Sequence, residues 1–119
     1  MGTSANVKSH FISCNFDLDY YEKKEFKRII KNIIYDAIDE KWFDFTRENY
    51  IEEKLESKFK GSWYVKIYDE KEYYEKNIGS YESDTAIYYH LIDEGGLLSD
   101  AKGEYFYIKK KSGSDCFIF

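Results

Sequence analysis

The chain has 119 residues, of which 43% are hydrophobic and 34% are charged, a mixture typical of one folded domain with a solvated surface. The formal net charge of −5 and the interspersed lysines form no basic stripe, which argues against a nucleic-acid partner. No apolar run approaches the roughly 20 residues that span a bilayer, so we expect a soluble, intracellular protein without a membrane partner.

The first elements predicted along the chain are a strand and a long helix. Residues 1–6 are small and polar and are expected to be disordered, so a single domain is expected over residues 7–119. Residues 7–16 have the mixed pattern of a strand. An aspartate between positions 17 and 19 can cap the following helix, in which apolar residues recur every three or four positions. These residues are Phe26, Ile29, Ile30, Ile33, Ile34, Ala37 and Ile38.

A second helix is predicted after a charged and aromatic connection at residues 40–45. Thr46 is its expected N-cap. Ile51, Leu55 and Phe59 form a narrow apolar stripe that ends before Gly61, a typical helix stop. Two consecutive helices are therefore expected to pack on the sheet that the remaining chain forms.

From Trp63 onward the pattern is that of short strands. They are predicted at residues 63–68, 78–83, 86–92 and 104–110, with a charged loop at 69–76 and a turn at 93–96. Residues 112–119 end in an apolar Phe-Ile-Phe run and are expected to dock on the domain. The predicted fold class is α+β, with two consecutive helices packed on an antiparallel sheet in the order strand-helix-helix-strand-strand-strand-strand.

The sequence contains no recognisable catalytic or metal-binding motif. His10 and His90 stand alone within expected strands, and Cys14 and Cys116 lie near opposite ends without metal-ligand spacing. The glycine pair at 95–96 lacks the lysine and hydroxyl residue of a phosphate-binding loop. We therefore predict a protein that is not an enzyme, with no catalytic residues, no metal and no cofactor, and with both cysteines as reduced thiols.

Three segments together resemble the dynein light chain family. They are residues 51–65, which end a helix and begin a strand at Trp63, the Asn-Ile-Gly-Ser-Tyr run at 77–81, and the Ile-Lys-Lys-Lys-Ser-Gly run at 108–113. The resemblance covers roughly residues 7–113 and implies a homodimer in which one strand is exchanged between subunits. It also implies two grooves, each of which binds a short linear peptide as an added antiparallel strand.

The resemblance assigns residues to the groove and to the dimer interface. The dimer interface would include Trp63, Tyr64 and Tyr81. The implied partners are peptide segments of other proteins, such as a dynein intermediate chain or a cargo adaptor, in the cytoplasm at the cytoskeleton. Gly79 would let two backbones approach closely. The groove would consist of the exchanged strand and two residues of the following strand, namely Asn77, Ile78, Gly79, Ser80, Tyr81, Ser83, Tyr88 and His90.

The chain also departs from the family pattern. Ile78 replaces a phenylalanine, the connection before it is longer, residues 93–103 are an insertion, and the acidic-basic pair that opens the family's second helix is not reproduced near Asp44 and Phe45. Tyr64 replaces a histidine of the family's interface, so acid-driven dissociation through that residue is not expected. Two alternatives stay open. One is a Tctex-type dynein light chain that uses its edge differently, and the other is an unrelated small enzyme or inhibitor protein, which would be a monomer.

Overall fold

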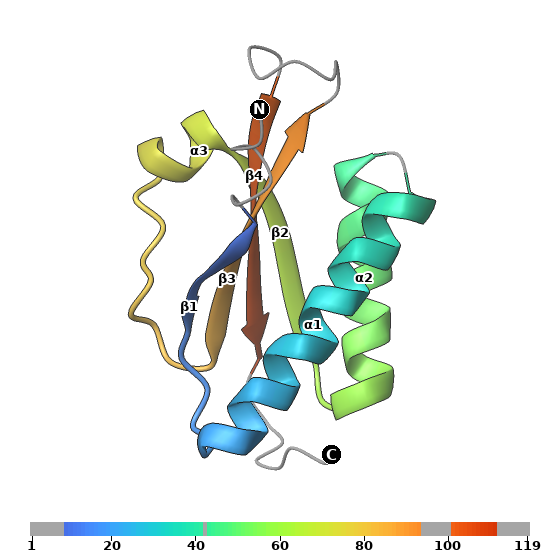
Figure 1. Cartoon of the computed structure of the whole chain (residues 1–119), viewed down its shortest axis with the longest axis vertical. Coiled ribbons are helices and arrows are strands. Elements are labelled where there is room, and N and C mark those ends of the chain that lie inside the picture. Colours follow the sequence, from blue (N-terminus) through green and yellow to red (C-terminus); the bar gives the residue numbers. More distant parts are fainter. Residues whose placement is uncertain (1–8, 42, 94–100, 112–119) are drawn as a thin grey trace, which may run out of the picture.

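The computed structural model describes residues 9–41, 43–93 and 101–111. Its elements are β1 (His10–Cys14), α1 (Tyr20–Glu40), α2 (Asp44–Phe59), β2 (Trp63–Asp69), α3 (Glu70–Glu75), β3 (Thr85–Asp93) and β4 (Ala101–Lys110). Helices α1 and α2 lie side by side on one face of a four-stranded antiparallel sheet, and α3 lies on the opposite side (Figure 1). The predicted α+β class, with two consecutive helices on an antiparallel sheet, is confirmed.

The order of the strands in the sheet is β1-β3-β4-β2, and each neighbouring pair is antiparallel. Strands β1 and β2 are therefore the two edges. β2 pairs with β4 along its whole length, from Trp63 opposite Lys110 to Asp69 opposite Glu104. The register of β1 shifts between Phe11 and Ser13. Irregularities of this kind are common at sheet edges, where they hinder pairing with another chain.

Helix α1 begins at the cap that the sequence predicts. Asp19 Oδ1 accepts a hydrogen bond from the Glu22 N–H at 2.8 Å, and Glu22 Oε1 accepts one from the Asp19 N–H at 3.2 Å. This reciprocal pair satisfies two of the N–H groups that a helix start leaves without partners. The helix then buries its apolar stripe, which consists of Phe26, Ile30, Ile33, Ile34 and Ala37.

Helix α2 begins two residues before the predicted cap. Its first residue is Asp44 and its N-cap is Phe43, whose side chain makes no capping hydrogen bond. Thr46 lies within the first turn, and its hydroxyl donates to the Phe43 carbonyl oxygen at 2.8 Å. The prediction of Thr46 as N-cap was wrong because a threonine hydroxyl can also bond a carbonyl of the preceding turn. The predicted apolar stripe of Ile51, Leu55 and Phe59 is buried.

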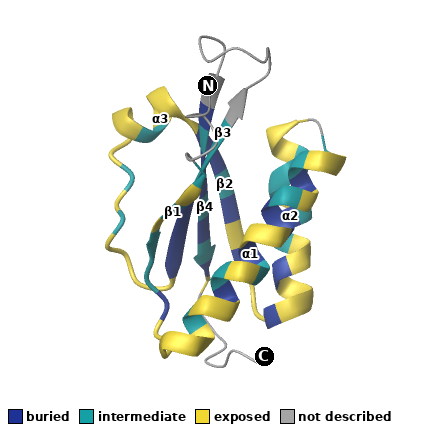
Figure 2. Ribbon diagram, viewed as in Figure 1, coloured by how far each residue is buried: buried dark blue, intermediate teal, exposed yellow. Residues whose placement is uncertain are grey.

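The main core lies between the two helices and the sheet, where Figure 2 shows the buried faces of α1, α2 and the strands turned toward one another. Trp63 is at its centre with 1% of its surface exposed. Its ring centroid lies 5.8 Å from that of Phe16, 6.3 Å from that of Phe26 and 5.9 Å from that of Phe59. The indole N–H donates to the Lys60 carbonyl oxygen at 2.7 Å, which satisfies the polar atom of this buried ring.

A second, smaller cluster lies on the other face of the sheet. Tyr68, Ile87 and Tyr105 are buried there, and Tyr73 of α3 stacks on Tyr105 with ring centroids 3.8 Å apart. Residues 69–76 were predicted as a loop, but most of them form α3. Asp69 and Glu72 make the same reciprocal capping pair as Asp19 and Glu22.

Several predictions concern residues that the structure does not describe. The expected disorder of residues 1–6, the first two residues of the strand predicted at 7–16, the docking of residues 112–119 and the state of Cys116 lie outside the described residues, as does most of the turn at 93–96. The rest of that predicted strand is longer than β1, because Ser9, Asn15 and Phe16 are not part of it. Within the described ranges, none of the helices combines the length and the apolar character that a membrane-spanning helix needs.

Gly103 of β4 lies against the ring of Tyr89. A Cβ atom at Gly103 would be 2.5 Å from Tyr89 Cε1 and 2.6 Å from its hydroxyl oxygen. We expect Gly103→Ala to lower the free energy of unfolding by about 1 kcal/mol, because the ring would have to shift within its packed cluster. Urea unfolding measures the change. Gly79→Ala is the control, since a Cβ there meets nothing within 4 Å. Equal losses in the two variants would contradict the prediction.

Candidate functional site

The outer edge of β2 is the first part of the candidate site. The backbone N–H of Val65 donates to Glu52 Oε2 at 2.9 Å, and that of Ile67 donates to Glu48 Oε2 at 2.8 Å. Glu48 and Glu52 are four residues apart on α2, so they project from the same side of the helix. The glutamates thereby take up N–H groups that a neighbouring strand would otherwise bond.

The same pattern continues to the end of β2. The Asp69 N–H donates to Glu72 Oε1 at 3.2 Å, so Val65, Ile67 and Asp69 each bond a glutamate carboxylate. Hydrogen bonds to a charged acceptor are stronger than those to a neutral one. If these bonds were lost, the N–H groups at the edge would have to donate to water instead. The edge beside α2 is therefore closed by side chains and not by a strand.

Residues 77–83, which the resemblance assigns to an exchanged strand, are not in a strand in this chain. We call them the exchange segment. Asn15, just after β1, holds the segment from one side, because its side-chain NH₂ donates to the carbonyl oxygens of Ser80 at 2.5 Å and Glu82 at 3.2 Å. The Asp84 N–H donates to the Asn15 carbonyl oxygen at 2.9 Å. The prediction of a strand at 78–83 was wrong for the single chain. The carbonyl oxygens of this segment accept hydrogen bonds from the Asn15 side chain and not from the backbone of a neighbouring strand.

Glu82 ties the exchange segment to β4. Its carboxylate accepts hydrogen bonds from Lys109 Nζ at 2.7 Å and from the Tyr107 hydroxyl. The bond from Lys109, followed by that from Tyr107, lowers the pKa of Glu82. The pKa of Tyr107 is raised, first by desolvation and then by the bond to Glu82. Ile78 packs at the edge of the tyrosine cluster. These contacts hold the segment against its own sheet.

The remaining predicted groove residues are not gathered in one place within a single chain. Asn77, Gly79, Tyr81 and Ser83 are exposed, and Tyr81 has 94% of its surface in solvent. An added Cβ at Gly79 would meet nothing within 4 Å in the single chain, so the close backbone approach predicted there would have to come from a second chain.

Tyr88 and His90 lie on the helix-facing side of β3. Tyr88 is buried, and its hydroxyl lies 3.2 Å from that of Tyr35. His90 Nδ1 is 2.9 Å from Ser9 Oγ. Burial, followed by the charge of Arg47, lowers the pKa of His90, so its imidazole is neutral at physiological pH. Both side chains are thus engaged in packing beneath α1 and not with the exchange segment.

The three residues assigned to a dimer interface occupy different environments. Trp63 is in the core and has no surface to offer a second subunit unless the chain opens. Tyr64 is 40% exposed and lies on the opposite face of β2, where its ring is 6.3 Å from that of Tyr107. Tyr81 is fully accessible. We call the single chain, with residues 77–83 held against its own sheet, the closed chain. Of the three residues, only Tyr64 and Tyr81 present surface to a partner in the closed chain.

Comparison with known proteins gives no match, either to a protein-family model or to a curated protein. Within the described residues, no three histidine, cysteine, aspartate or glutamate side chains are grouped as metal ligands. The β2 edge and the exchange segment are therefore the features of the fold that bear on function.

Glu82→Gln is expected to loosen the exchange segment. It removes the charge of an exposed ion pair, worth about 0.5 kcal/mol, so the Asp84 amide should exchange faster with solvent. Because the pKa of Glu82 is lowered in the fold, its contribution is present above the ordinary glutamate pKa of about 4.3. It is lost as pH falls through the lowered value. Hydrogen exchange and urea unfolding from pH 7 to pH 2.5 measure both effects.

The matched control is Glu75→Gln, which removes the exposed pair that Glu75 makes with Lys71 in α3. It should not change exchange at Asp84. A stability difference between wild type and Glu82→Gln that persists unchanged at pH 2.5 would contradict the assignment of the effect to this carboxylate.

Proposed function

We propose that this protein is a non-catalytic interaction module of the dynein light chain type, which binds extended peptide segments of partner proteins along the outer edge of β2. The arrangement of the helices and strands supports this proposal. Two consecutive helices cover one face of the sheet, and the order β1-β3-β4-β2 places the β2 edge next to α2. The resemblance itself places the groove between the second helix and the exchanged strand at residues 77–83, and the β2 edge beside α2 is our assignment for the single chain. The partner class is a peptide segment of a dynein intermediate chain or of an adaptor, met in the cytoplasm at the cytoskeleton.

The observation that carries this proposal is the pair of hydrogen bonds from Val65 and Ile67 to glutamate side chains. An incoming extended segment offers backbone carbonyl oxygens at the same spacing, since alternate residues of a strand direct their N–H groups to one edge. The glutamates can swing toward solvent when a strand replaces them. Main-chain bonds would then supply affinity that depends little on peptide sequence, and the α2 side chains would supply selectivity.

Homodimerisation is the second part of the proposal. Exchange of residues 77–83 would place this segment on the β2 edge of a second subunit, where it would compete with Glu48 and Glu52 and also with a partner peptide for the same edge. It would also have to leave Asn15, Tyr107 and Lys109 of its own chain. The closed chain and the exchanged dimer therefore use the same groups in mutually exclusive ways. Their equilibrium is set by the difference between two sets of hydrogen bonds and depends on protein concentration.

The first experiment is the solution mass by light scattering, from sub-micromolar to high micromolar concentration, at neutral and mildly acidic pH. It is combined with amide NMR of Val65 and Ile67 during titration with an extended intermediate-chain peptide. We expect a dimer at high concentration that persists in mild acid, and shifts at both amides on peptide addition. A monomer at every concentration whose two amides do not respond would overturn the proposal and favour the monomeric inhibitor alternative.

A further inference from the structure

Two large apolar side chains are exposed where α2 begins. Phe43 has 72% of its surface in solvent and Phe45 has 66%, although they lie only two residues apart in the chain. Single exposed apolar residues are common, but neighbouring ones often mark a place where a partner binds. We call these two residues the phenylalanine pair. Figure 1 shows the start of α2 at the upper right, on the opposite side of the view from β1 and α3, and Figure 2 shows it coloured as exposed.

Phe43 occupies a position where the fold favours another residue. It is the N-cap of α2, and its side chain makes no capping hydrogen bond. Serine, threonine, asparagine or aspartate at an N-cap satisfies an N–H group of the first helical turn, which phenylalanine cannot do. At this residue an apolar ring is exposed to water and the cap is missing as well. Residues that break local rules in this way are expected at functional sites.

The backbone at the phenylalanine pair is held in place. The hydroxyl of Thr46 donates to the Phe43 carbonyl oxygen at 2.8 Å, and the Arg47 N–H donates to the same oxygen at 2.9 Å. The Arg47 side chain donates to the Lys41 carbonyl oxygen at 2.9 Å, and its Nη1 lies 3.5 Å from Glu104 Oε1 of β4. The start of α2 is thereby tied to the end of α1 and to the sheet. A partner that binds here meets an ordered backbone, which lowers the entropy cost of binding.

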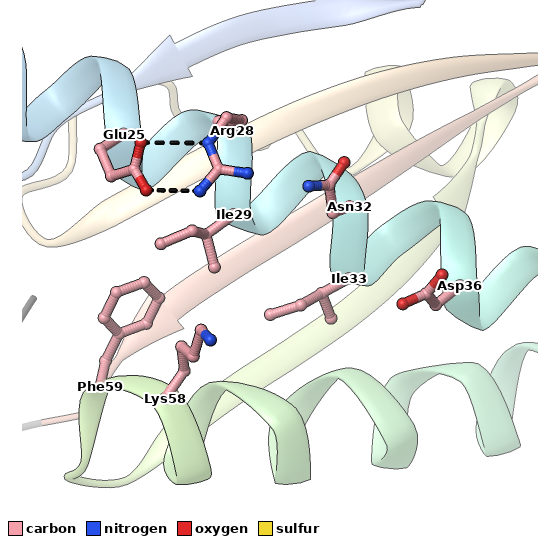
Figure 3. A pocket seen from close by; sticks show the side chains of 8 residues that line it. All are labelled: Glu25, Arg28, Ile29, Asn32, Ile33, Asp36, Lys58 and Phe59. Carbon is pink, nitrogen blue, oxygen red and sulfur yellow. Dashed lines mark hydrogen bonds and ion pairs between the residues drawn. The ribbon is translucent and has the colours of Figure 1, made fainter.

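The groove between α1 and α2 offers no comparable surface. It encloses about 610 Å³, and Figure 3 shows Ile33 and Phe59 among the side chains that line it. Their apolar surface is already buried in the core, since Ile33 is 9% exposed and Phe59 is 1% exposed. Glu25 and Arg28 on the rim are paired with each other. The apolar area that is open to a partner therefore lies at the phenylalanine pair and not in this groove.

The charge around the phenylalanine pair is negative. Residues 36–48 contain five acidic and two basic side chains, so they carry −3 of the net charge of −5. Both basic residues are engaged within the chain, because Lys41 Nζ lies 5.4 Å from the ring centroid of Tyr50 and Arg47 lies between two carboxylates. The exposed carboxylates that flank the pair are Asp39, Glu40 and Asp44. Such a surface favours a partner that is both apolar and basic, and it disfavours an anionic membrane.

We propose that the phenylalanine pair is a further docking surface of this protein, and that its partner is an amphipathic helix whose apolar stripe is flanked by lysine or arginine. A helix carries both features, since residues at three- and four-residue spacing share one face. Burial of the two rings supplies the affinity, and the carboxylates of Asp39, Glu40 and Asp44 orient the helix and exclude acidic partners. The surface consists of other residues than the β2 edge and the exchange segment, so the proposal does not depend on strand addition.

The probe is a synthetic amphipathic helix of leucine and lysine, about 18 residues or five turns long. Its dissociation constant with the full-length protein is measured by fluorescence anisotropy. The double variant Phe43→Ser and Phe45→Ser should bind at least about tenfold more weakly than wild type. The matched control is Tyr20→Ser with Tyr21→Ser, which removes two rings of similar exposure from the other end of α1. It should bind within about twofold of wild type.

A charge reversal tests the electrostatic part of the proposal. Asp39→Lys with Glu40→Lys should weaken binding of the lysine peptide more than Glu53→Lys with Glu56→Lys, which makes the same change of net charge at exposed positions of α2. A peptide of leucine and glutamate with the same pattern should bind wild type at least about tenfold more weakly than the lysine peptide. Equal losses in the two reversed variants would assign the binding to net charge alone and would overturn the proposal.

The single variant Phe43→Ser separates a binding role from a structural one. Serine can accept a hydrogen bond from the first turn of α2, so this variant should unfold at a higher urea concentration than wild type while its binding weakens. A lower urea midpoint would assign the ring to the stability of the fold and would overturn the proposal.

The remaining outcomes distinguish other occupants. Wild type that does not bind the lysine peptide, or equal losses in the phenylalanine and tyrosine variants, would overturn the proposal. Binding to neutral phosphatidylcholine vesicles that requires Phe43 and Phe45 would overturn it in favour of a membrane surface. Self-association that requires them, measured by light scattering, would overturn it in favour of a second copy of this chain.

Discussion

Replacing Glu48 and Glu52 together by alanine is expected to open the β2 edge and to shift the protein toward its dimer. In the closed chain their carboxylates bond the Ile67 and Val65 N–H groups, and a strand that adds to this edge must displace them. Hydrogen bonds to charged groups contribute about 1.5–3 kcal/mol each. The double substitution should therefore tighten dimerisation by at least about tenfold, since 1.4 kcal/mol is one factor of ten. Analytical ultracentrifugation measures the dissociation constant.

The control for this experiment is the double variant Glu53→Ala and Glu56→Ala. It removes the same charge from exposed positions of the same helix, so it separates the opening of the edge from a general change in electrostatics. If the variant lacking Glu48 and Glu52 stays monomeric and merely loses stability, these carboxylates only protect the edge, and strand addition there would be discarded.

The second large effect is expected at Trp63. Substitution by alanine should lower the free energy of unfolding by about 3–5 kcal/mol, the range for buried Phe and Trp truncations. That is a large part of the roughly 5–15 kcal/mol typical of a domain. The reason is that the indole fills the space among Phe16, Phe26 and Phe59. Urea unfolding at two protein concentrations measures this change in the free energy of unfolding.

Tyr64→Ala provides the comparison for Trp63→Ala, because Tyr64 is the next residue and is 40% exposed on the other face of β2. It should cost about 1 kcal/mol or less in the closed chain. If the stability lost in Trp63→Ala grew on dilution, and the stability lost in Tyr64→Ala grew in the same way, Trp63 would belong to a subunit interface. That result would contradict its place in the core.

Most of the fold could be predicted because its elements carry strong local signals. The stripe of α1, the cap at Asp19 and the change of period at Trp63 each point to one structure. Helix α3 was missed because six residues, none of them fully buried, are too few to show a periodicity. A signal was nevertheless present, since Asp69 and Glu72 have the spacing of a capping box. The extended pattern of residues 78–83 was misleading because a strand also needs a neighbour.

The candidate site was harder to predict than the fold. Glu48 and Glu52 belong to no motif that marks them in the sequence, and their role depends on how α2 lies against β2, which local pattern does not fix. One clue was available. Each stands three residues before a buried residue of α2, Ile51 or Leu55, so both are on the side of the helix that turns toward the sheet. The contacts of Asn15 with a segment 65 and 67 residues away could not be read from spacing.

The place of β4 in the sheet has a consequence for how the protein is made. Among the described residues β4 comes after the other strands in the sequence, but it is a central strand of the sheet, where it joins β3 to β2. During synthesis β2 therefore emerges with its inner edge open, and its partner exists only after residues 70–100 have been added and β4 itself has been made. Before β4 is made, only local structure such as α1 and α2, together with the pairing of β1 and β3, can form. We expect the four-stranded sheet to be completed only after β4 has been made.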